Sequence, residues 1–353
     1  MASKKKTDGE ELSQEELETK FDAASGEAPV KLKQQVKVKN KSSFSLSDYR
    51  KEKQADVVNF KPQTWINMSP AFQEVTGLQG IPEGAITMCA GRSDSGKSTT
   101  LLELAKYAQQ QNILPVFIIT EKKWSWERCA EMGIDSEKCI ARLDIDFIEE
   151  GCDFIEEILK DQAEGRLPQD IVFLWDSIGA TPSKKEYEAA EEGEGGGGMM
   201  LTARVLRERF NRRISHKISN TRKETHPYNA TLFIVNQSYQ APPSFPGGPT
   251  TLKHYGGEGI YYAATLVFRM GGVMSNSSKV KATKDGTQVA FAIRSALVIE
   301  KNHITNVAPD GKVLCTPHGF ITDSKESMDA YKAQYKDGWQ LEFDKDWNAV
   351  SKD

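Results

Sequence analysis

One stretch limits what this chain can fold into more than any other: Gly91-Arg92-Ser93-Asp94-Ser95-Gly96-Lys97-Ser98, which fits the pattern G-x-x-x-x-G-K-[ST]. Glycines in this pattern let backbone N–H groups turn inward and surround phosphate oxygens. Lys97 would place a positive charge on the outer phosphates, and Ser98 would offer its hydroxyl to Mg²⁺. The helix that follows points its positive end at the same anion. We therefore predict a nucleoside triphosphate site at residues 91–99, with Thr99 as its last member.

The residues on both sides of this loop have the pattern that the motif requires. Before it, residues 85–90 form a short apolar run that is typical of a buried strand. After it, residues 99–111 carry leucines and alanines at helical spacing. Strand, glycine-rich loop and helix in this order favour a phosphate-binding loop over a chance match in an ordinary turn.

Strand and helix patterns alternate along the middle of the chain. Predicted strands lie at 115–120, 171–176 and 231–236, and predicted helices at 124–132 and 148–163. This alternation predicts an α/β fold with a mainly parallel central sheet and helices on both faces. Further on, residues 265–270 and 289–301 are strand-like, and residues 271–288 are predicted to form a hairpin or loop.

The two ends of the chain differ from this core. Residues 1–55 are polar and charged, and we predict a partly disordered arm, with subunit docking as the alternative. The compact core is assigned to residues 56–325. Residues 326–353 form a charged tail in which a helix near 327–335 is expected.

Composition excludes some classes of protein. In 353 residues no apolar run approaches ~18 residues, so no membrane span is expected. The net charge of −4 argues against a uniformly basic nucleic-acid binder but leaves room for a local basic channel. The five cysteines form no C-x-x-C pair, which indicates reduced thiols in a cytoplasmic protein.

Three polar side chains follow the predicted strands at the point where each strand ends. In a parallel sheet these ends lie at one edge, beside the phosphate loop. Asp176 follows an apolar strand and suits the carboxylate on the Mg²⁺ side of the site. Glu121 is a candidate to orient and deprotonate the attacking water. Gln237 is a candidate to sense the γ-phosphate through its side-chain amide.

Two long loops leave the same edge, and loops of this length inside a compact domain are usually functional or disordered. One surrounds a run of four glycines, and the other covers residues 238–259. Between them, residues 204–223 form a basic stretch that could supply cations to a phosphate backbone or could be a solvated helix face.

The order of these motifs resembles that of the RecA-type recombinases, and most closely the bacteriophage UvsX-like branch. The resemblance covers about residues 56–320 and rests on an ordered series rather than on one motif. After the phosphate loop come Glu121, Leu174-Trp175-Asp176-Ser177, the glycine-rich loop, Phe233-Ile234-Val235-Asn236-Gln237, Gly256-Gly257-Glu258-Gly259, Leu266-Val267-Phe268-Arg269 and Val298-Ile299-Glu300-Lys301-Asn302-His303.

The resemblance implies a helical filament on single-stranded DNA that binds ATP and Mg²⁺ between neighbouring subunits and pairs with homologous double-stranded DNA. It also implies that Lys301 reaches the γ-phosphate of the adjacent subunit. It further implies that the two loops hold DNA, and the residues that we assign to DNA are Gly195, Gly196, Gly197, Gly198, Met199, Met200, Arg204, Tyr239, Phe245, Gly256 and Gly257. His303 stands where RecA has a second lysine, which weakens that contact. If the protein is phage-encoded, it would act in the host cytoplasm, with phage mediator and single-strand-binding proteins as partners.

Two other functions use the same features. A ring-forming RecA-fold helicase would share the ATP site and the central loops, but it would usually carry a separate helical domain before the core. A nucleotide-gated DNA-binding scaffold would bind ATP with little turnover. Stimulation of ATP hydrolysis by DNA and the shape of the oligomer on DNA separate these alternatives from a recombinase.

Overall fold

The chain is described from a computed structural model, which covers residues 63–193, 198–218, 227–241, 250–271, 278–284, 287–305 and 309–335, together with residues 45, 47–49, 243, 245, 248 and 307. The chain divides into two units, Met1–Lys61 and Pro62–Asp353. Almost all of the predicted arm at residues 1–55 lies outside the described residues. The remaining description concerns the second unit.

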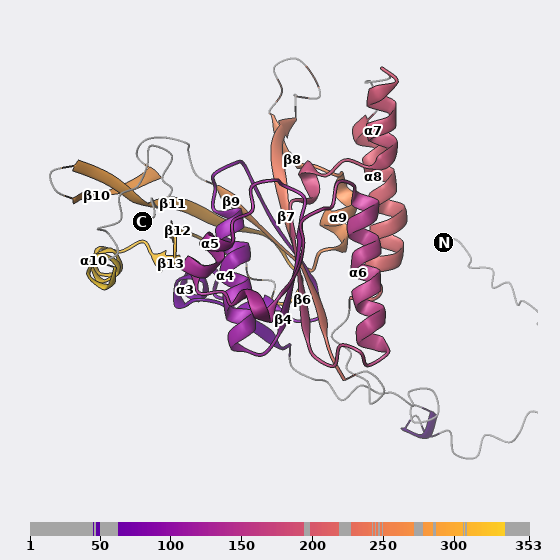
Figure 1. The fold of residues 1–353 in the computed structure, drawn as a ribbon, viewed down its shortest axis with the longest axis horizontal. Coiled ribbons are helices and arrows are strands. Elements are labelled where there is room, and N and C mark those ends of the chain that lie inside the picture. Colours follow the sequence, from indigo (N-terminus) through magenta and orange to yellow (C-terminus); the bar gives the residue numbers. More distant parts are fainter. Residues whose placement is uncertain are drawn as a thin grey trace, which may run out of the picture. The chain divides into compact units, whose positions relative to one another are not determined.

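One large sheet organises this unit (Figure 1). Its strands are β3 (Ile86–Gly91), β4 (Leu114–Ile119), β5 (Ile140–Arg142), β6 (Ile171–Asp176), β7 (Ala230–Ala241), β8 (Thr251–His254), β9 (Leu266–Gly271), β10 (Lys279–Lys284), β11 (Thr287–Asn302), β12 (Asp310–Thr316) and β13 (Gly319–Thr322). They lie in the order β13-β12-β11-β9-β3-β7-β6-β4-β5, with β10 paired to β11 and β8 to β7. The strands from β9 to β5 run parallel, and β11, β12 and β13 extend the sheet with antiparallel pairs. A separate pair, β1 (Trp65–Asn67) and β2 (Gly80–Pro82), precedes it.

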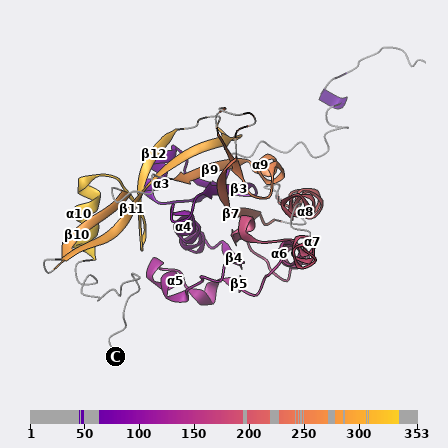
Figure 2. The same ribbon diagram turned by 90° about the horizontal axis from the view of Figure 1, so that it is seen from above.

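Helices cover both faces of the sheet (Figure 2). On one face lie α3 (Pro70–Thr76), α4 (Lys97–Gln110) and α5 (Trp126–Met132). On the other lie α6 (Ile148–Ala163), the π-helix η3 (Leu206–Ile214) and α9 (Glu258–Ala263). The remaining helices are the short 3-10 turns η1 (Ser136–Lys138) and η2 (Ile178–Ala180), α7 (Lys184–Glu191), α8 (Gly198–Val205) and α10 (Lys325–Gln334).

Alternation along the central strands builds a core on each face. On β7, Phe233 and Val235 join the core beneath α4, whereas Leu232 and Ile234 join the core beneath α6. Successive side chains of a strand point to opposite faces, so a strand covered on both sides appears as an unbroken apolar run. This arrangement confirms the predicted α/β fold with a parallel central sheet and helices on both faces. Within the described residues, no helix is both long and apolar enough to cross a membrane.

The second predicted loop is partly a β-hairpin. β7 continues to Ala241 and pairs with β8 in an antiparallel register that sets Tyr239 opposite Lys253. The extension was not predicted because its residues are mostly polar and carry no apolar alternation. The hairpin expected at residues 271–288 is present as β10 and β11. α10 lies where a helix was expected, and its Tyr331 is buried in a small cluster with Phe291.

Candidate nucleotide site

The predicted phosphate loop joins β3 to α4, and its glycines are required by the strands packed against it. Gly96 has a φ of +100°, in the left-handed region that favours glycine. A Cβ on Gly96 would lie 2.5 Å from Sγ of Cys315, and one on Gly91 would overlap the carbonyl oxygen of Met270. β11 also contacts the loop, since Ser295 Oγ donates a hydrogen bond of 2.6 Å to the carbonyl of Ser95. Strands β11 and β12 of the antiparallel part of the sheet therefore pack against the phosphate loop.

The polar groups of the loop fit a phosphate. Lys97 is buried, and its Nζ donates a hydrogen bond of 2.6 Å to the carbonyl of Arg92 within the same loop. The Oγ of Ser95 is buried with no hydrogen-bond partner among the described residues. Thr99 is buried one turn into α4, and its hydroxyl accepts a hydrogen bond of 3.2 Å from Arg128. An enclosed ammonium and an orphaned hydroxyl at a helix N-terminus suit an anion. Arg92, Ser93 and Asp94 are exposed.

The strand-end residues meet beside this loop, as the sequence predicted. Ser98 Oγ donates to Asp176 Oδ2 at 2.8 Å. Glu121 Oε1 accepts hydrogen bonds from Ser177 Oγ at 2.9 Å and from Gln237 Nε2 at 3.3 Å. Sequence reasoning did not assign a role to Ser177, although its position directly after a strand-end aspartate was a signal for one. The peptide bond between Asp176 and Ser177 is cis.

Burial raises the pKa of Asp176 to about 6. The hydrogen bond from Ser98 lowers this pKa, while the negative charge of Glu121 raises it. A cation placed at this carboxylate would favour the ionised form. Mg²⁺ in nucleotide sites usually takes one or two protein oxygen ligands together with phosphate oxygens. Ser98 and Asp176 have the chemistry to hold it there, and bound Mg²⁺ would neutralise charge on the phosphates.

The residues expected to act across a subunit interface lie at the end of β11. Lys301 Nζ donates to the carbonyl oxygens of Tyr261 at 2.9 Å and Tyr262 at 3.1 Å. Burial lowers the pKa of Lys301. His303 is exposed, and only its backbone N–H, which donates to Thr265, has a hydrogen bond among the described residues. Within one chain the Lys301 amine contacts α9, and its reach to a neighbouring subunit stays a prediction.

The first DNA loop is described only in part. Residues 194–197, which include Gly195, Gly196 and Gly197, lie outside the described residues, as do the side chains of residues 198 and 199. Met200 is 79% exposed at the start of α8. Arg204 is exposed, and its Nε donates to Glu208 at 3.0 Å. Three cations of the basic stretch that follows pair with acidic side chains of α6, in the ion pairs Arg209–Asp153, Arg213–Glu156 and Lys217–Glu156.

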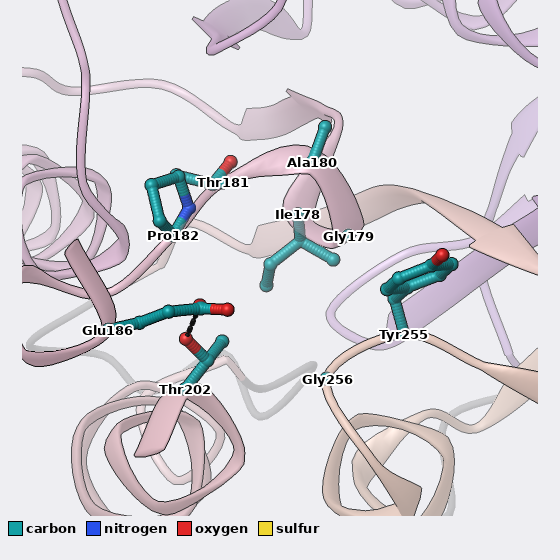
Figure 3. A pocket seen from close by; sticks show the side chains of 9 residues that line it. All are labelled: Ile178, Gly179, Ala180, Thr181, Pro182, Glu186, Thr202, Tyr255 and Gly256. Carbon is teal, nitrogen blue, oxygen red and sulfur yellow. Dashed lines mark hydrogen bonds between the residues drawn. The ribbon is translucent and has the colours of Figure 1, made fainter. Parts of the chain in front are cut away.

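The second DNA loop contributes aromatic rings and two glycines. The Tyr239 ring packs at 4.9 Å against Tyr255, whereas Phe245 is 63% exposed. Gly256 and Gly257 have φ values of +78° and +73° just before α9. A cavity of about 280 Å³ lies between the bases of the two loops, and Figure 3 places the hydrogen-bonded pair Glu186 and Thr202 on one side of it and Tyr255 with Gly256 on another. The described residues that flank the two loops thus line one cavity.

A phosphate loop, strand-end carboxylates and a parallel sheet together define a P-loop nucleotide-binding protein. The family model described as the RecA N-terminal domain matches residues 38–302. The chain belongs to this family.

The protein is also similar to curated relatives at low identity. It is 27% identical to protein RecA of Aquifex aeolicus over 214 residues, which cover 60% of this chain and 56% of that protein. It is 24% identical to protein RecA of Mesoplasma florum over 229 residues, 62% of this chain and 63% of that protein. It is 26% identical to protein RecA of Clostridium botulinum strain Eklund 17B over 224 residues, which cover 61% of this chain and 57% of that protein. The chain therefore spans less than two thirds of the length of these relatives.

Proposed function

We propose that this protein is an ATP-dependent DNA strand-exchange recombinase that forms a filament on single-stranded DNA and hydrolyses ATP between subunits. One observation carries the proposal. Glu121 accepts hydrogen bonds from Ser177 and Gln237 and lies beside the hydrogen-bonded pair of Ser98 and Asp176. A carboxylate held by neutral donors next to a phosphate loop is suited to accept a proton from water. Membership of the RecA family supports the same reaction.

Each residue of the site has a separate task in this proposal. The backbone of the loop and Lys97 bind and orient the phosphates, and Lys97 gives up its hydrogen bond to Arg92 to do so. Ser98 and Asp176 hold Mg²⁺, which stabilises the negative charge that develops on the phosphates. Glu121 orients the water and accepts its proton. Gln237 donates to Glu121, and it would report the state of the γ-phosphate to the hairpin of β7 and β8.

DNA would bind where the two loops converge. Met200 and Phe245 expose apolar surface there, and base stacking on an aromatic ring contributes ~1–3 kcal/mol per base. Gly256 and Gly257 adopt the left-handed backbone that glycine favours just before α9, at the base of the second loop. Lys301 would act on ATP held by the neighbouring subunit. We place the protein in the UvsX-like branch because of the ordered series of motifs from the phosphate loop to residues 298–303, with phage mediator and single-strand-binding proteins as the partners that this branch implies.

The test is the rate of ATP hydrolysis with and without single-stranded DNA, measured on wild type, Lys97→Ala and Glu121→Gln. We expect strong stimulation by DNA in wild type and its loss in both variants, while Glu121→Gln still binds ATP. Lys160→Ala, which changes an exposed lysine on α6, serves as the control and should behave as wild type. Hydrolysis that is indifferent to DNA in the wild type would refute the proposal, and a closed ring on DNA in electron micrographs would favour a helicase.

A further inference from the structure

A chain of hydrogen bonds joins the hairpin of β7 and β8 to the end of β11, and none of its members belongs to the nucleotide site. His254, the last residue of β8, stands opposite Ser238 in the hairpin, and its Nδ1 lies 3.0 Å from Ser238 Oγ. On its other side, His254 Nε2 lies 3.2 Å from Glu300 Oε2. The second oxygen of Glu300 accepts a hydrogen bond of 2.7 Å from Arg269 on β9. The network therefore spans strands β7, β8, β9 and β11.

Glu300 occupies an irregular position in β11. The pairing of β11 with β9 shifts register between Ile299 and Lys301, so Glu300 is the extra residue of a β-bulge. A bulge changes the direction of the side chains that follow it. The next residue is Lys301, whose amine is directed to the carbonyl oxygens of Tyr261 and Tyr262. By binding Glu300, His254 and Arg269 therefore stabilise the bulge that sets the direction of the Lys301 side chain.

The side chains of this network are well enclosed. The His254 side chain is 12% exposed and that of Glu300 is 21% exposed. Burial alone would raise the pKa of Glu300, but the hydrogen bonds from His254 and Arg269 outweigh it and hold this pKa below its ordinary value. Glu300 is therefore ionised, and it needs both donors because an unpaired carboxylate at this depth is costly.

Tyr261 provides a second connection between the same two residues. Its ring is stacked on the ring of His254, with centroids 6.0 Å apart and an angle of 14° between the planes. Lys301 Nζ lies 5.3 Å from the centroid of the Tyr261 ring. His254 therefore acts on Lys301 through Glu300 in the bulge and through Tyr261 on α9, so a shift of β8 would disturb both contacts.

We propose that His254 is a positioning residue that couples the hairpin of β7 and β8 to Lys301. The inference rests on the proposed function, in which this hairpin contacts DNA and Lys301 contacts the neighbour's nucleotide. Ser238 directly follows Gln237, which donates a hydrogen bond to Glu121. The network therefore connects Glu121, the proposed general base of one nucleotide site, with Lys301, which would act at the nucleotide site of the neighbouring subunit. A DNA-induced displacement of the hairpin would move His254, release or tighten Glu300, and change the position of Lys301.

The experiment measures coupling rather than activity alone. Two ratios are determined for wild type and His254→Ala: the rate of ATP hydrolysis with poly(dT) over the rate without it, and the affinity for a fluorescent ATP analogue with poly(dT) over the affinity without it. We expect both ratios to fall at least about fivefold in His254→Ala, since coupling between sites usually amounts to about 5–150-fold. The affinity for the analogue alone should stay within about twofold of wild type.

Matched variants separate positioning from a loss of structure. His254→Gln keeps an amide donor for Glu300 and should restore most of both ratios, whereas His216→Ala, at an exposed histidine after η3, should not change them. Glu300→Gln should lower the ratios as His254→Ala does, and combining the two should add little, because both remove one connection. If His254→Ala does not fold, Glu300→Gln carries the test.

The possible results separate a failure of the proposed coupling through His254 from a failure of the proposed recombinase function. If DNA does not stimulate the wild type, the proposed function fails and the inference falls with it. If DNA stimulates the wild type and both His254→Ala and Glu300→Gln keep its ratios, the inference alone is overturned. Full additivity of the two substitutions would also overturn it, because independent effects do not describe a shared connection.

Discussion

Replacing Asp176 with asparagine should make the nucleotide-free protein more stable at pH 8. Burial raises the pKa of this carboxyl from 3.8 to about 6, so at pH 8 the folded protein must hold an ionised group in a place that disfavours it. The difference corresponds to up to about 3 kcal/mol of unfolding free energy, at about 1.4 kcal/mol for each factor of ten in the proton equilibrium. Asparagine keeps an oxygen that can accept the hydrogen bond from Ser98 and removes the charge.

The sign of the pH dependence follows from proton binding. Between pH 3.8 and about 6 the folded state holds a proton on Asp176 that the unfolded state has released, so the free energy of unfolding falls as the pH rises through this window. Below pH 3.8 both states are protonated and the penalty is absent. The stability advantage of Asp176→Asn should therefore be small at pH 4, grow up to about pH 6, and change little above it.

Urea unfolding at pH 4, 6 and 8, without nucleotide or DNA, measures this difference. Asp144→Asn makes the same chemical change at an exposed aspartate whose pKa is lowered by Arg142, and it should bring no gain at pH 8. With Mg²⁺ and ATP the order should reverse, because the metal stabilises the ionised aspartate in wild type and asparagine offers it no charge. A gap between the variant and wild type that does not change with pH would refute the reasoning.

Three further changes test the site and its supports. Glu121→Gln should lower the DNA-stimulated turnover by ~10²–10⁴ with little change in ATP affinity, measured by steady-state hydrolysis and nucleotide titration. Gly96→Ala should cost about 1–3 kcal/mol in urea unfolding, more than Gly165→Ala, because both have positive φ but only the Cβ at residue 96 meets a neighbour. Ser69→Ala should destabilise the fold by about 1–2 kcal/mol, because this buried N-cap of α3 also donates to a buried carboxyl group. Ser125→Ala, at the partly exposed cap of α5, should cost less, and equal losses would contradict this account.

The phosphate loop and the central strands could be predicted because their signals are local. Residues 91–98 need their glycines for reasons that apply to any phosphate loop, and residues 171–175 of β6 are all apolar because helices cover both faces of the strand. The meeting of Glu121, Asp176 and Gln237 followed from one topological rule, since parallel strands end at the same edge of a sheet.

The missed features depend on residues that are far apart in the chain. His254 and Glu300 are separated by 46 positions, and nothing near either of them in the sequence indicates the other. The bulge at Glu300 is a property of its pairing with β9 rather than of its own residue type. The basic stretch at residues 204–223 was a possible source of cations, and its sequence gave no sign that Arg209 and Arg213 pair with Asp153 and Glu156. These two partners lie on a helix 56 and 57 residues earlier.

The strand β11 contacts the phosphate loop of its own chain at one point and carries at another the lysine that we propose acts across the subunit interface. Ser295 of β11 is hydrogen-bonded to the loop at Ser95, and Lys301 follows six residues later on the same strand. Six residues of extended chain span about 20 Å. In the proposed filament, β11 would act as a rigid spacer between the subunit's own nucleotide and that of its neighbour. The repeat distance of the filament would then be limited by the length of β11. A displacement of the phosphate loop at one nucleotide site would move Lys301 at the next site.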